Sequence, residues 1–92
     1  MDRNEIVNKV AQQVRRSLDD ERAAGASFPD KCRLGVRVLA AGEFGYTVNV
    51  RLDGLSIEVN VATMDARTEA HDIMRPIDML VRQWLARRKN PP

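Results

Sequence analysis

The alternation of apolar and polar residues between positions 33 and 62 constrains the fold more than any other feature of this sequence. Three runs with apolar side chains at every second position follow one another at residues 33–40, 46–52 and 55–61. Strict alternation is typical of β-strands with one buried and one solvated face. We therefore expect a three-stranded antiparallel sheet over residues 32–62. In its first strand the buried face would be formed by Leu34, Val36, Val38 and Ala40.

The last two runs are joined by Asp53-Gly54, a dipeptide that strongly favours a two-residue hairpin turn. A turn at this place segregates apolar pairs on one face from polar pairs on the other, and a shift of one residue would destroy the segregation. The expected apolar pairs are Leu52–Leu55, Val50–Ile57 and Val48–Val59, and the expected polar pairs are Arg51–Ser56 and Asn49–Glu58.

The segment before the strands, residues 1–25, has the pattern of an amphipathic helix. Asp2, with Glu5 three residues later, forms a capping pattern at its start, and Ala24-Gly25 is expected to end it. Its apolar stripe recurs every three or four positions and consists of Ile6, Val7, Val10, Ala11, Val14 and Leu18.

The segment after the strands, residues 65–89, also keeps its apolar residues on one face. Asp65 or Thr63 is expected to cap it. Pro76 removes a backbone donor and clashes one turn back, so we expect either one helix kinked near Pro76 or two short helices in line.

Two helices with one apolar side each and a sheet with one apolar face can bury these surfaces together in two layers. We expect an α+β fold of order α-β-β-β-α, with both helices on one face of the sheet. The length of 92 residues suits a single domain, residues 1–92. No apolar run is long enough to span a membrane. Twelve of the fifteen basic residues are arginine. A single cysteine agrees with a reducing compartment, so we expect a cytoplasmic protein. A bacterial or phage origin is a separate expectation.

The chain lacks the sets of residues that catalysis and metal binding require. His71 is the only histidine, and Cys32 the only cysteine, so neither can complete a zinc site. The carboxylates at residues 19–21 are consecutive on a helix and point in different directions. No glycine-rich phosphate-binding motif is present. We therefore expect no enzyme activity, no metal and no cofactor.

The polar face of the predicted sheet is the first candidate for partner binding. Its arginines offer planar groups suited to carboxylates and phosphates, although an ordinary solvated face would show the same alternation. We expect a small non-catalytic adaptor, regulator or inhibitor that binds a protein partner. The expected binding residues are Arg33, Arg37, Asn49, Arg51, Glu58 and Asn60.

The alternative is a protein that binds DNA or double-stranded RNA with the same arginines and a basic C-terminal turn. Positive charge in that turn can contact phosphates, but it also complements the helix dipole. The expected sheet face has no aromatic residue on which single-stranded bases could stack. The phosphate-binding residues would be Arg82, Arg87, Arg88 and Lys89.

The order α-β-β-β-α is similar to that of two nucleic-acid-binding families. In double-stranded-RNA-binding domains a lysine cluster opens the second helix, whereas residues 65–72 here are acidic. The YbaB-type nucleoid-associated proteins are similar in element order only and form dimers, and topology alone does not carry function. A homodimer is nevertheless an expectation here, because a three-stranded sheet has two edges with unpaired backbone groups. Gly35 is expected to weaken the edge of the first strand.

Overall fold

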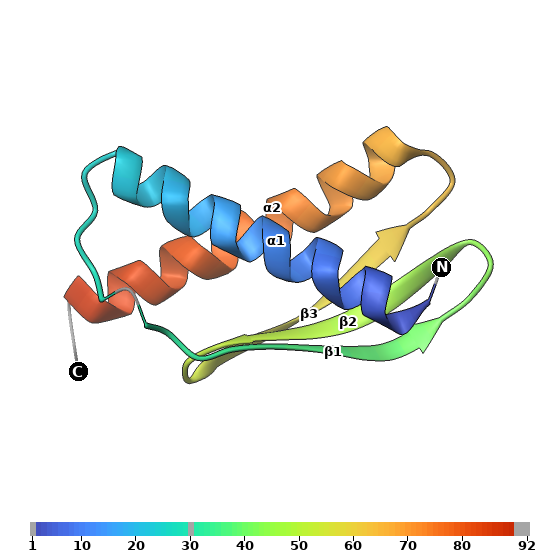
Figure 1. Cartoon of the computed structure of the whole chain (residues 1–92), viewed down its shortest axis with the longest axis horizontal. Helices are drawn as coiled ribbons and strands as arrows, with labels where there is room; N and C mark the ends of the chain where they lie inside the picture. The colour runs from blue at the N-terminus through green and yellow to red at the C-terminus, as the bar shows by residue number, and fades with distance from the viewer. Residues whose placement is uncertain (1, 30, 90–92) are drawn as a thin grey trace.

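The computed structural model describes residues 2–29 and 31–89, except for the side chain of Lys89. Two helices, α1 (Arg3–Ala23) and α2 (Ala66–Lys89), flank three strands in the chain. The strands β1 (Leu34–Ala41), β2 (Gly45–Leu52) and β3 (Leu55–Ala62) form one antiparallel sheet in the order β1-β2-β3. Both helices cover the same face of the sheet, so the expected α+β sandwich is confirmed (Figure 1). On the sheet, α1 packs on β1 and α2 packs mainly on β3, and the two helices also pack against each other.

The ends of α1 follow the chemistry expected from the sequence. At the start, Asp2 Oδ1 accepts a hydrogen bond from the Glu5 backbone N–H at 2.8 Å. At the other end, Gly25 has a φ of 103°, which favours glycine. The Ala26 N–H donates back to the carbonyl of Glu21 at 2.9 Å, so the last turn is closed by the left-handed Gly25 that follows the C-cap Ala24.

The hairpin register is confirmed for every pair expected from the sequence, polar and apolar alike. The same register extends through β1, where Val36 lies opposite Val50. The apolar positions therefore meet in a single layer beneath the helices. This layer and the two helices form a core of Ile6, Val10, Val14, Leu18, Val38, Tyr46, Val48, Val50, Leu52, Val59, Val61, Ile73, Ile77, Leu80, Val81, Trp84 and Leu85.

The end of β1 differs from the expectation, because the strand contains a β-bulge. The step from the pair Val38–Val48 to the pair Ala40–Thr47 leaves Leu39 as an extra residue. An extra residue shifts the phase of the alternation. The prediction that Ala40 lies on the buried face is therefore wrong: Ala40 is exposed beside Thr47 on the opposite face.

α2 is one continuous helix through Pro76, so the alternative of two short helices is wrong. Of the two expected caps, Asp65 fills the role: its Oδ1 accepts from the Thr68 N–H at 2.8 Å, and its Oδ2 accepts from the Thr68 hydroxyl at 2.9 Å. These hydrogen bonds lower the pKa of Asp65. Among the described residues, no helix is long and apolar enough to cross a membrane.

A buried carboxylate joins the two helices and the sheet. Glu69 is only 8% exposed, and its Oε1 lies 2.8 Å from Lys9 Nζ and 3.4 Å from the Tyr46 hydroxyl. Burial and the adjacent Glu69 raise the pKa of Tyr46 to about 12. Ser17 on α1 also donates to Asp78 on α2. Polar contacts thus help to orient the helices around the apolar core.

Candidate binding surface

The sheet face that the helices leave uncovered is the candidate site, and we call it the open face (Figure 1). The strand register arranges its side chains in rows that cross all three strands. These rows are Gly35–Arg51–Ser56, Arg37–Asn49–Glu58 and Ala40–Thr47–Asn60. Arg33 precedes β1 at the end of the sheet where the Asp53-Gly54 turn lies.

Three guanidinium groups of the open face have no hydrogen-bond or ion-pair partner among residues 2–29 and 31–89. Arg33, Arg37 and Arg51 are exposed, and within the described part of the chain none of their side chains forms an ion pair or hydrogen bond. Glu58 lies in the same row as Arg37 but on the far edge strand, two strand spacings of about 5 Å away. The open face therefore carries unneutralised positive charge with one acid beside it.

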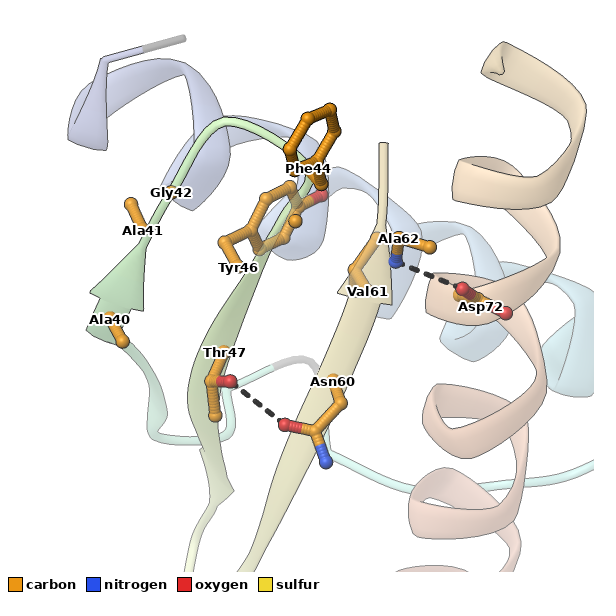
Figure 2. A pocket seen from close by; sticks show the side chains of 11 residues that line it. Ala40, Ala41, Gly42, Phe44, Tyr46, Thr47, Asn60, Val61, Ala62 and Asp72 are labelled. Carbon is orange, nitrogen blue, oxygen red and sulfur yellow. Dashed lines mark hydrogen bonds between the residues drawn. The ribbon is translucent and has the colours of Figure 1, made fainter. Parts of the chain in front are cut away.

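The amides between these charges are held in place by the sheet. Asn49 donates from Nδ2 to the Ile57 carbonyl at 3.2 Å. Asn60 accepts from the Thr47 hydroxyl at 2.8 Å (Figure 2). These contacts fix two amide side chains, and they do not involve the guanidinium groups. The structure thus brings together all six residues expected to bind a partner, on one side of one sheet or at its rim.

Sequence reasoning missed an apolar end of this surface at the β1–β2 hairpin. A shallow pocket of about 500 Å³ opens there, lined on the sheet side by Ala40, Thr47 and Asn60 (Figure 2). Phe44 borders it and is 72% exposed. Met64 lies near the same hairpin, because it follows Thr63, whose backbone N–H donates to the Phe44 carbonyl. The β-bulge decides the chemistry of this end, because it turns Ala40 outward.

At the β2–β3 turn, the opposite end of the sheet, Asp53 forms hydrogen bonds with two other segments. Asp53 Oδ1 accepts from the Arg33 N–H at 2.8 Å, and Asp53 Oδ2 accepts from Trp84 Nε1 at 2.8 Å. Phe28 packs edge-on against Trp84, with 5.3 Å between ring centroids. The backbone that precedes β1 is therefore anchored, and Arg33 projects from a fixed point.

The described C-terminal basic side chains, Arg82, Arg87 and Arg88, do not form one surface. Arg82 Nε lies 3.9 Å from Glu21 Oε1 on α1. The Arg88 guanidinium stacks over Trp84, with its central carbon 5.0 Å from the ring centroid. Arg87 is exposed, and the side chain of Lys89 lies outside the described residues. At 100° per residue, positions 82, 87 and 88 point in three directions around the helix. Two of these residues thus have contacts within the domain.

Cys32 and His71, the only cysteine and the only histidine of the sequence, are the remaining residues with reactive side chains. Burial, followed by the nearby Asp53 carboxylate, raises the pKa of the Cys32 thiol, so the unreactive protonated form dominates at neutral pH. His71 is exposed. Across residues 2–29 and 31–89, no three His, Cys, Asp or Glu side chains come together in a way that could hold a metal ion.

Comparison with known proteins adds no assignment to this geometry. No family model, no curated protein and no solved structure matches the chain.

Proposed function

We propose that this protein is a non-catalytic interaction module that binds an acidic or mixed-charge protein surface through its open face. The observation that carries the proposal is the set of unpaired guanidinium groups of Arg33, Arg37 and Arg51 on the uncovered side of the sheet. Arginine is well suited to such an interface because its planar fork binds carboxylates in two places.

The composition of the open face supports a protein partner over a nucleic acid. Glu58 sits in the same row as Arg37, where it would repel a phosphate backbone and can pair with a basic residue of a protein. The pocket at Ala40 and Phe44 offers an apolar contact beside the charges, as protein interfaces require.

Binding of DNA or double-stranded RNA remains the second proposal, with the same arginines in contact with phosphates. The scattered positions and internal contacts of Arg82 and Arg88 reduce the support for the C-terminal turn as a phosphate site. The two proposals differ in salt dependence, because phosphate contacts release counterions and weaken steeply as salt rises.

The deciding experiment compares two charge-reversal variants of the same net charge. The first carries Arg37→Glu and Arg51→Glu on the open face, and the second carries Arg16→Glu and Arg67→Glu on exposed helix positions. Immobilised wild-type protein and both variants are used to capture partners, which are then identified by mass spectrometry. Each protein is also titrated into labelled duplex DNA and RNA at low and high salt.

The proposal expects the wild-type protein and the helix variant to capture the same protein, and the open-face variant to lose it. Equal capture by both variants would remove the open face as the site. Tight duplex binding that falls steeply with salt and disappears in the open-face variant would instead establish the nucleic-acid alternative.

A further inference from the structure

The two edges of the sheet are covered differently. At the β3 edge, the Ala62 N–H points away from β2 and donates to Asp72 Oδ2 of α2 at 3.0 Å (Figure 2). Farther along this edge, Glu58 and Asn60 line a surface pocket together with Arg75 of α2. Within the described residues, no side chain caps a backbone N–H of β1 in this way.

The backbone groups that β1 leaves free follow from one hydrogen bond. The Asp53 N–H donates to the Arg33 carbonyl at 2.7 Å, so the backbone of Arg33 faces β2. Backbone direction alternates along an antiparallel strand, which places Gly35 and Arg37 toward β2 as well. The N–H and C=O groups of Leu34, Val36 and Val38 therefore face outward. This edge stays regular until the bulge at Leu39.

We propose that a second copy of this chain pairs with β1 along this edge, in antiparallel orientation, with the two-fold axis at Val36. The pairing joins three strands from each copy into one continuous sheet. Outward N–H and C=O groups of Leu34, Val36 and Val38 find partners, and the half-buried side chains of Leu34 and Val36 lose their remaining contact with water. Exposed edges of this kind are templates for pairing with another chain.

The charge pattern selects the register. An axis at Gly35 would place Arg33 opposite Arg37 of the second copy, and an axis at Arg37 would place two copies of Arg37 face to face; like charges directly opposite are destabilising. An axis at Val36 instead places Arg37 opposite Gly35 of the second copy, and Leu34 opposite Val38. Gly35 leaves room for the arginine, because a Cβ added there would meet nothing closer than Arg51 Cβ at 3.9 Å.

The dimer would also change the binding surface, a consequence that rests on the proposed function. Arg37 and Arg51 of both copies would surround the two-fold axis on one continuous open face. Their mutual repulsion opposes assembly in the absence of a partner, and an acidic partner bound across the axis would relieve it. Partner binding and dimerisation would then strengthen each other.

The first test measures molar mass by light scattering over a concentration series, at low and high salt. Wild-type protein should approach twice its mass of 10.4 kDa at high concentration, and more readily at high salt because the arginines are screened. Val36→Pro removes an outward N–H of β1 and should stay monomeric. Ser56→Pro removes the equivalent group on the β3 edge and should still dimerise. Loss of the dimer only in Ser56→Pro would overturn the proposal.

The second test determines the register without relying on a disruptive variant. In a Cys32→Ser background, Gly35→Cys and Arg37→Cys are prepared separately and oxidised alone or mixed. The proposed axis makes residues 35 and 37 of opposite copies a non-hydrogen-bonded pair with Cα atoms about 4.5 Å apart, within disulfide range. Two copies of either residue lie on a diagonal of about 7–8 Å, beyond that range.

A disulfide dimer in the mixture alone is the expected result. A dimer from Gly35→Cys alone or from Arg37→Cys alone would place the axis at that residue and overturn the register. A wild-type monomer at every concentration, with no disulfide in the mixture, would overturn the pairing itself. Neither result affects the proposed function, which the comparison of the open-face and helix charge-reversal variants tests independently.

Discussion

The two faces of the sheet are built from the same strands, yet one is buried against the helices and the other faces solvent. On the face beneath the helices, Val48 and Val50 are fully buried in the apolar core. On the open face, the intervening residues Asn49 and Arg51 contact neighbours of the sheet or only solvent. Because adjacent residues alternate between the faces, stability and binding are encoded at neighbouring positions and should be separable by single substitutions.

The largest effect should come from Val50→Asp, which places a carboxylate at the centre of the buried face. We expect a loss of more than about 4 kcal/mol, because the charge would have no partner among the apolar residues around it. That is comparable with the whole stability of a small domain, so the variant should be unfolded by circular dichroism. Arg51→Asp is the matched control on the open face and should remain folded. A native spectrum for Val50→Asp would contradict the register.

A smaller effect is expected where the two faces meet at the Asp53 turn. Trp84→Phe keeps an aromatic ring against Phe28 but removes the Nε1–H that donates to Asp53 Oδ2. A hydrogen bond to a charged group contributes about 1.5–3 kcal/mol, and we expect a loss near the lower value because Asp53 keeps its bond to the Arg33 N–H. Urea unfolding measures the change. An unchanged midpoint would show that this bond does not stabilise the turn.

The pH dependence should reveal the buried network beneath the sheet. The pKa of Tyr46 is raised from 10.0 to about 12 in the folded chain, so above pH 10 the unfolded state loses the phenolic proton first. The stability that the raised pKa of Tyr46 contributes is therefore fully present below about pH 10 and is lost as pH rises towards 12. Tyr46→Phe should remove this part of the decline in urea unfolding. Tyr46 is the sole tyrosine, so its absorbance reports the titration directly, and a midpoint near 10 would contradict the raised value.

The smallest effect on stability should come from the open face itself. Arg37→Ala and Arg51→Ala remove exposed side chains that form no hydrogen bond or ion pair within the described residues, so each should change the free energy of unfolding by less than about 0.5 kcal/mol. Partner binding should weaken in the same variants. Thermal unfolding measured beside binding provides the comparison. A large loss of stability in either variant would mean that these arginines support the sheet.

Local rules explain how much of the fold could be predicted from the sequence. The period of two, the Asp53-Gly54 turn and the Asp2 and Asp65 caps each act over a few residues, and the structure follows them everywhere except at the end of β1. The β-bulge escaped prediction because Val38 to Ala40 is compatible with a regular strand. For the candidate site, alternation was sufficient to group Arg37, Asn49 and Glu58, since register places them in one row.

The sequence by itself determined the elements, their order, the hairpin register and the polar residues of the open face, because each depends on periodicity or on turn chemistry between near neighbours. Tertiary structure alone decided which charged side chains form contacts within the domain. Lys9 contacts Glu69 across sixty positions of the chain, and Arg82 and Arg88 form contacts away from any common surface. Asp72 caps one sheet edge, whereas no side chain in the described part of the chain caps a backbone N–H of β1. Such contacts depend on how the helices settle on the sheet, and packing of the apolar core sets that arrangement.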